Sequence, residues 1–197
     1  MSAVMIERAH VEALTNRRAI VEALEAAHEE AVVYWDQYTT PSFFLPHGEH
    51  WSAADHVRHL TRSMTPILPV LRVPRLALRV AFGAPTEPPR SLEQIGSVYM
   101  AALDAGGTAG RFAPPPEKGA RDQVRRDRIM DTHSETLRGL TQAMERWSEA
   151  ELDAYRLPHP LLGRLSVREM MFFTLVHNRH HVAVAERRRV ETGARFA

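Results

Sequence analysis

Four stretches of the chain repeat apolar residues at steps of three and four, the spacing that lines one face of an α-helix. The first, residues 6–38, contains no glycine or proline, and the third spans residues 117–147. We predict a long helix from each. The two core faces are Leu14, Val21, Leu24, His28, Ala31, Trp35 and Tyr38, then Ile129, His133, Thr136, Leu140, Met144 and Trp147. His28 and His133 are interpreted either as hydrogen-bonded core residues or as the lining of a polar pocket.

The second helix is predicted to follow Ser52, because Ser52 and Asp55 have the spacing of a capping box. Its core face comprises Val57, Leu60, Met64, Ile67 and Leu71. His56 and His59 lie on one flank of that face, so either histidine could look into a site beside the core. The periodicity slightly favours His56, which is nearer to the centre of the stripe.

A connection of about 45 residues separates the second helix from the third, which frees them from the antiparallel hairpin that a short loop imposes. It carries a basic stripe of Arg72, Arg75 and Arg79, interpreted as a solvated helix face or as a surface for a membrane or an anionic substrate. A capping box at Ser91 and Gln94 predicts a short helix to about Leu103. We therefore predict an all-α four-helix bundle with a long crossover between helices 2 and 3 that carries one or two short extra helices.

The last stretch, residues 161–191, begins with a loop and continues as a helix capped by Ser166 and Glu169. Apolar residues surround this helix on nearly every side. It is therefore either the central helix or one that packs against a second subunit, and we expect a homodimer. His177 and His181 lie one helical turn apart and about 40° around the axis, so both imidazoles can reach one ion.

Histidines that point into an apolar seam are costly unless their ring nitrogens find partners. Three neutral imidazoles with an open coordination position can hold a catalytic divalent metal, here zinc or nickel. His177 and His181 supply two ligands, and the third must come from His56 or His59. Carboxylates near the core faces are further candidate ligands: Asp55, Asp127 and Asp131.

The composition narrows the possible functions. With 44% hydrophobic residues the chain can bury a core as one domain, residues 1–197. The 25 basic and 24 acidic residues nearly cancel, so no net field attracts nucleic acid or acidic membranes. The absence of cysteine excludes disulfides, thiolate ligands and a cysteine nucleophile. With no signal peptide or membrane span in the sequence, we expect a soluble, cytoplasmic protein with a small-molecule substrate.

Other catalytic motifs are absent from the sequence. Asn178 occupies the position of the catalytic glutamate in the His-Glu-x-x-His motif of zinc proteases. No glycine-rich phosphate loop and no Gly-x-Ser-x-Gly elbow is present. The sequence therefore identifies no catalytic residue beyond the candidate metal ligands.

Two blocks together resemble the motifs of the DinB/YfiT-like superfamily, of the DinB_2 type. The first, residues 51–60, is similar to the family's Trp-Ser-x-x-Glu-x-x-x-His-Leu motif, with Asp55 in place of the usual glutamate. The second comprises residues 159–166 followed by His177-x-x-x-His181. Many members carry a glutamine three residues after the last histidine, where this chain has Val184. The resemblance covers both motifs and the helix layout of nearly the whole chain.

The resemblance implies a four-helix bundle and a metal site formed by His59, His177 and His181, since the family's first histidine directly precedes leucine. It also implies an activity, because members include S-transferases that use bacillithiol or mycothiol and relatives that isomerise maleylpyruvate. We expect a metal-dependent enzyme that activates a small thiol, or a hydrolase that activates water. The alternative is a non-enzymatic, stress-related binding or assembly module whose histidines are structural.

Overall fold

The computed structural model describes residue 14 and residues 16–196. Its contacts divide the chain into two compact units. The histidine unit comprises the described residues of Glu25–Leu68, Ala109–Leu140 and His177–Ala197. The hairpin unit comprises the described residues of Met1–Leu24, Pro69–Thr108 and Thr141–Val176.

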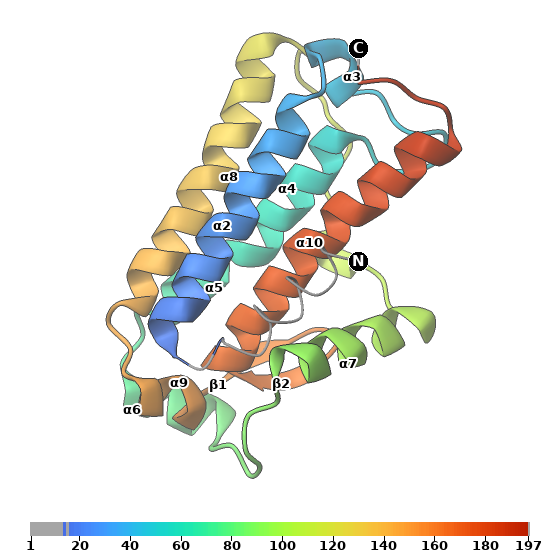
Figure 1. Ribbon diagram of the computed structural model, residues 1–197. Coiled ribbons are helices and arrows are strands. Elements are labelled where there is room, and N and C mark those ends of the chain that lie inside the picture. The colour runs from blue at the N-terminus through green and yellow to red at the C-terminus, as the bar shows by residue number, and fades with distance from the viewer. Residues whose placement is uncertain (1–13, 15, 197) are drawn as a thin grey trace. The chain divides into compact units, whose positions relative to one another are not determined.

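The histidine unit contains all or part of four helices, and this largely helical structure confirms the predicted helical fold (Figure 1). They are α2 (Arg17–Asp36), α4 (Ala53–Met64), α8 (Gln123–Met144) and α10 (Val167–Glu191). His28 of α2 packs against His133 of α8, with ring centroids 5.1 Å apart. Thr61 of α4 contacts the same His133, and His56 of α4 contacts His181 of α10.

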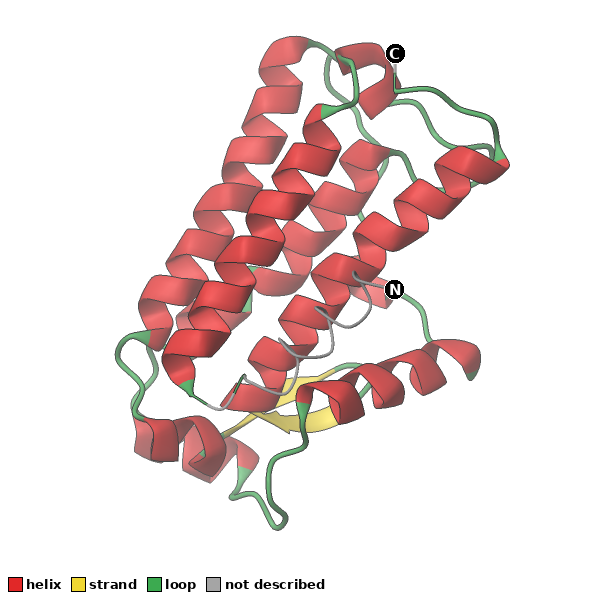
Figure 2. Cartoon of the chain, in the orientation of Figure 1, coloured by secondary structure: helices red, strands yellow, loops and turns green. Residues whose placement is uncertain are grey.

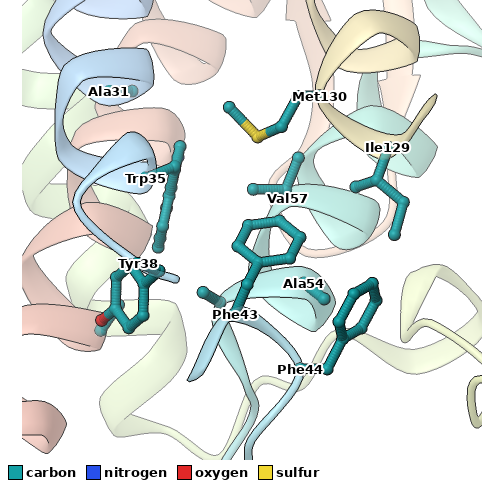
Figure 3. Packing of buried hydrophobic residues seen from close by; sticks show 11 residues of the cluster. Ala31, Trp35, Tyr38, Phe43, Phe44, Ala54, Val57, Ile129 and Met130 are labelled. Carbon is teal, nitrogen blue, oxygen red and sulfur yellow. The ribbon is translucent and has the colours of Figure 1, made fainter. Parts of the chain in front are cut away.

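Aromatic side chains dominate one end of this unit (Figure 3). The Trp35 and Phe43 side chains are fully buried, and the short helix α3 (Thr40–Phe43) carries Phe43 into the cluster. Burying such rings contributes on the order of 2–3 kcal/mol each. The cluster joins α2, α3, α4, α8 and α10 through Ala31, Trp35, Tyr38, Phe43, Phe44, Ala53, Ala54, Val57, Ile129, Met130 and Ala185.

Within the described residues, the helix predicted over residues 6–38 is observed as α2. Leu14 is not helical, and α2 starts at Arg17, where the Asn16 Oδ1 accepts a hydrogen bond from the Ala19 N–H at 2.9 Å. An asparagine cap of this kind satisfies a first-turn donor and sets the start of a helix. Residues 6–13 and 15 of the predicted helix lie outside the described residues.

The third long helix is also shorter than predicted, and α8 covers Gln123–Met144 rather than residues 117–147. Asp122 precedes it, and its Oδ1 accepts a hydrogen bond from the Arg125 N–H at 2.9 Å. The inward positions are confirmed, since Ile129, His133, Thr136, Leu140, Met144 and Trp147 are all buried.

The crossover carries two short helices, α6 (Arg75–Phe82) and α7 (Leu92–Asp104), as predicted. It also contains the one-turn helix α5 (Ile67–Val70), which follows α4, and the 3₁₀ turn η1 (Gly110–Phe112). Two residues of the arginine stripe have partners within the hairpin unit. The Arg75 Nε donates to Glu151 at 3.0 Å, and the Arg79 guanidinium lies 5.2 Å from the Tyr155 ring centroid. Arg72 is exposed.

The hairpin unit contains a small antiparallel sheet where the sequence predicted a loop (Figure 2). Strand β1 (Arg156–His159) pairs with β2 (Gly163–Ser166), with Leu157 opposite Leu165. Both leucines are buried. Gly163 has φ 74°, a conformation that favours glycine. The short helix α9 (Glu149–Ala154) precedes β1 and begins at a capping box of Ser148 and Glu151.

The first part of the last helix is buried on every side. Ser166 and Glu169 cap it as predicted, and residues 167–175 are all buried. The chain itself therefore covers this part of the helix, whereas the remainder has one exposed side, with Arg179, Ala183, Arg187 and Val190. The homodimer stays a prediction. Among the described residues, no helix combines the length and apolarity needed to cross a bilayer.

Candidate metal centre

Three buried histidines of the histidine unit bring their Nε2 atoms together. His59 lies on α4, and His177 and His181 lie one turn apart on α10. The His177 Nε2 is 3.0 Å from the His59 Nε2 and 3.0 Å from the His181 Nε2. One nitrogen of each ring lies within 4.8 Å of the other two. The three histidines named by the family resemblance therefore form one group.

The hydrogen on His59 can be assigned from its neighbour. Its Nδ1 lies 3.0 Å from the Phe112 carbonyl oxygen, which only accepts hydrogen bonds. The Nδ1 therefore carries the hydrogen, and the Nε2 of the neutral ring is an unprotonated lone pair. The Arg62 Nε donates to the same oxygen at 3.3 Å and its Nη2 to the Arg111 carbonyl at 2.9 Å, which ties η1 to α4.

The surroundings of His177 favour the same tautomer. Its Nδ1 lies 3.5 Å from the Ser63 Oγ, and the Ser63 hydroxyl donates to the Leu60 carbonyl at 2.8 Å. Because the Ser63 hydroxyl donates its only hydrogen to Leu60, its oxygen can only accept a hydrogen bond from the Nδ1–H of His177. That arrangement leaves a lone pair on the His177 Nε2, facing the lone pair of His59.

Three neutral rings cannot satisfy this group by themselves. Because the His59 Nε2 is a lone pair, its contact with His177 is a hydrogen bond only if the His177 Nε2 carries the hydrogen. That one hydrogen cannot also make a separate bond to the His181 Nε2, which lies equally close. A buried lone pair without a donor costs about 1–3 kcal/mol. The group therefore fits a cation that accepts several lone pairs at once.

Burial favours the neutral form of His59 and His181. Desolvation lowers the pKa of His59, against the raising effect of its bond to Phe112, and lowers the pKa of His181 well below the usual value. The spacing also suits a metal, because bonds of about 2.0–2.1 Å in a tetrahedral site place ligand nitrogens about 3.3–3.4 Å apart. The observed separations of 3.0 Å are within a few tenths of an ångström of that value.

The carboxylates that the sequence suggested as ligands are not part of the group. The Asp55 Oδ2 accepts hydrogen bonds from the backbone and hydroxyl of Ser52, and its Oδ1 accepts one from Arg58. Asp127 and Asp131 are exposed. The candidate ligand set is therefore three imidazoles.

His56, which the periodicity favoured over His59, is buried but lies outside the group. Its Nδ1 lies 2.8 Å from the Nδ1 of His181, on the side of that ring opposite to the Nε2 that faces the other two histidines. His180 is half-buried, with its ring centroid 5.5 Å from that of His181. The indole of Trp51 stacks on His181, with centroids 5.8 Å apart and planes at 12°.

The outer partners were harder to predict than the ligands. Ser63 lies on the flank of α4 that also carries His56 and His59, so helical spacing could identify it. The Phe112 carbonyl could not be found from the sequence, because any residue supplies one and the crossover places this one.

His28 and His133 form a second histidine pair within the same unit. The Nδ1 of His133 lies 3.2 Å from the Thr61 Oγ1, and the Nε2 of His28 lies 3.1 Å from the Ser134 Oγ. Both hydroxyls donate to backbone carbonyls, so they accept hydrogen bonds from the rings. Each ring therefore makes one hydrogen bond, as the core interpretation predicted, while the His28 Nδ1 and the His133 Nε2 are buried without a hydrogen-bond partner among the described residues.

Acid is expected to destabilise the protein through His133, whose pKa burial lowers to about 3. The unfolded chain takes up this proton below about pH 6.5, whereas the folded chain does not. The contribution of His133 to the free energy of unfolding is therefore fully present above pH 6.5. It falls by about 1.4 kcal/mol per pH unit between pH 6.5 and 3. Urea unfolding at pH 7, 6 and 5 measures this slope. His133→Asn should flatten it by about that amount, with substitution of the exposed His50 as control. An unchanged slope would contradict the assignment.

Comparison with known proteins agrees with this architecture. A sequence model described as the DinB superfamily matches residues 12–185, which include α4, the crossover, α8 and all four histidines at and beside the centre. No curated protein and no solved structure gives a significant match. The match spans most of the chain. This helical protein with its buried three-histidine group belongs to the DinB superfamily.

Proposed function

We propose that the protein is a divalent-metal-dependent enzyme whose ion is held by His59, His177 and His181. Its substrate would be a small thiol, as in S-transferases that use bacillithiol or mycothiol, or a water molecule in a hydrolase. The supporting observation is that three Nε2 atoms converge in a way that neutral rings cannot satisfy. A bound divalent ion would convert a coordinated thiol to its thiolate or lower the pKa of bound water to about 7.

The charge of the ligand set supports an anionic substrate. All three candidate ligands are imidazoles, and their Nδ1 atoms lie 3.0, 3.5 and 2.8 Å from a carbonyl, a hydroxyl and another imidazole, respectively. No carboxylate of the described residues belongs to the group. The protein therefore leaves the charge of a divalent ion uncompensated, which favours a thiolate or hydroxide in the open position.

The Trp51 ring supports the same proposal from one side of the centre. It stacks on His181 and lies 5.0 Å from the His59 ring, centroid to centroid. An apolar surface beside a metal site limits solvent access and lowers the local dielectric, which strengthens the interaction of the ligands with charge. Zinc and nickel are the proposed metals, because both accept imidazole ligands.

Metal is expected to stabilise the protein. Protein purified without a histidine tag should contain about one zinc or nickel ion per chain, and chelation should lower the melting temperature. Restoring the metal at about 100 times its Kd should return about 2.7 kcal/mol. For a domain of this size that is a rise of roughly 5–10 °C. Elemental analysis and thermal unfolding measure both effects. Protein that contains far less than one ion and takes up neither zinc nor nickel would contradict the proposal.

The two activities can then be separated from each other and from a binding module. The metal-loaded protein is incubated with a low-molecular-weight thiol and an electrophile, and separately with activated esters and amides. Thiol conjugation that chelation abolishes supports the transferase, and hydrolysis that chelation abolishes supports the hydrolase. Metal that raises the melting temperature without either activity favours the non-enzymatic module.

A further inference from the structure

Each of the three candidate ligands has a hydrogen-bond partner at its Nδ1, the nitrogen that does not face the centre. The Nδ1 of His59 has the Phe112 carbonyl as its partner, and the Nδ1 of His177 has the Ser63 oxygen. Metal-binding histidines usually donate this second N–H to an acceptor, which sets the tautomer and the orientation of the ring. The Nδ1 of His181 has a different partner, the Nδ1 of His56 at 2.8 Å.

Two hydrogen arrangements are possible for this contact. If His56 donates, the neutral His181 carries its hydrogen on Nε2 and presents an N–H to the centre. If His181 donates, its Nε2 is a lone pair that points toward His177 and His59. Only the second arrangement makes His181 a ligand, since a metal binds the unprotonated nitrogen.

We propose that His56 is a positioning residue that accepts the Nδ1–H of His181 and so holds its Nε2 ready for the ion. This assignment rests on the metal site of the proposed function. His56 then accepts the Nδ1–H of His181 in the same way that the Phe112 carbonyl accepts the Nδ1–H of His59. The sequence motif contains two histidines, three positions apart, with different tasks: one binds the ion and the other orients a ligand.

The surroundings of His56 suit this task. The ring is 3% exposed and parallel to Trp35, with centroids 6.1 Å apart and planes at 18°. The Trp51 ring also packs against it, with centroids 5.5 Å apart and planes at 71°. Its backbone N–H donates to the Ser52 carbonyl at 3.1 Å, in the capped first turn of α4. Packing and the cap therefore hold the acceptor still, which limits the orientations open to His181.

His56 is not a fourth ligand in this arrangement. It approaches His181 at Nδ1, whereas the centre lies at the Nε2 atoms of the three ligands. Because the His56 Nδ1 accepts the hydrogen bond from His181, its lone pair is not available to a metal ion, and the Nε2 of the neutral ring carries the hydrogen.

Two variants and one matched control test this assignment. His56→Leu removes the acceptor while keeping an apolar side chain in the space, and is expected to weaken zinc binding about 10- to 100-fold. His56→Asn places an amide oxygen near the position of the Nδ1 and should recover most of that loss. His47→Leu replaces another buried histidine, whose Nε2 lies 3.5 Å from the Tyr38 hydroxyl rather than at the metal centre, and should leave zinc affinity unchanged. Competition with a zinc-binding dye measures all four proteins.

The tautomer of His181 is measured separately, by ¹⁵N NMR of the metal-free full-length protein. The wild type and His56→Asn should show the hydrogen on Nδ1, and His56→Leu should lose this preference. A wild type with the hydrogen on Nε2, or a His56→Leu variant that binds zinc as tightly as the wild type, would overturn the role of His56. If His56→Leu does not fold, the position of the hydrogen on His181 in the wild-type spectrum still tests the role of His56. A wild type that shows the Nδ1–H tautomer but binds no metal supports the positioning of His181 and contradicts the proposed function instead.

Discussion

Replacing His177 by alanine should weaken zinc or nickel binding by more than the 10- to 100-fold expected for loss of an outer hydrogen-bond partner. The His177 Nε2 takes part in both 3.0 Å contacts of the group, so its removal leaves two nitrogens that have lost their common neighbour. Two imidazoles without it make an incomplete site for a divalent ion. The affinity is measured by competition with a metal-binding dye, in parallel with the melting temperature with and without metal.

The stability of the metal-free variant provides an independent check. The substitution removes one of the facing lone pairs but also leaves a cavity, so a loss of about 1–3 kcal/mol is expected without metal. The larger change should be loss of the metal-dependent rise in melting temperature. His50→Ala serves as the control, because His50 is exposed and outside the group. A His177→Ala protein that binds metal within tenfold of the wild type would exclude this histidine as a ligand.

Trp147→Ala is expected to destabilise the protein by about 3–5 kcal/mol. The side chain is 0% exposed, and its Nε1 donates to the Leu71 carbonyl at 3.3 Å. The Arg75 guanidinium lies 3.4 Å from the ring centroid and is paired with Glu151. Alanine would leave a cavity, a Leu71 carbonyl that keeps only its 3.5 Å contact with the Arg75 Nη1, and an arginine without its aromatic partner, all within the hairpin unit. Urea unfolding measures the loss.

Trp147→Phe separates these contributions. The smaller ring keeps part of the packing and a face for Arg75 but has no N–H for Leu71, so the expected loss is smaller than for alanine. The pair of variants therefore distinguishes ring packing from the hydrogen bond. A loss below about 1 kcal/mol for alanine would show that the surrounding residues close the cavity, contrary to this assignment.

Features with short-range causes were predictable from the sequence. The capping boxes at Ser52, Ser91, Ser148 and Ser166 each mark the start of a helix, because the residues that satisfy the first backbone donors lie within three positions. The same holds for His177 and His181, since helix geometry alone places residues four apart on one side. The long crossover followed from the distance between the apolar stretches.

Features that depend on partners distant in the chain required the folded structure. The hairpin of β1 and β2 was missed because four-residue strands gain their stability from packing rather than from their own pattern. His56 and His59 are both buried on one flank of α4, and spacing slightly favoured His56, whereas the group that could hold an ion contains His59. Which ring nitrogen meets which acceptor depends on the Phe112 carbonyl and on α10. A periodic pattern predicts which face of a helix a residue lies on, but it does not predict which atoms lie next to a particular ring nitrogen.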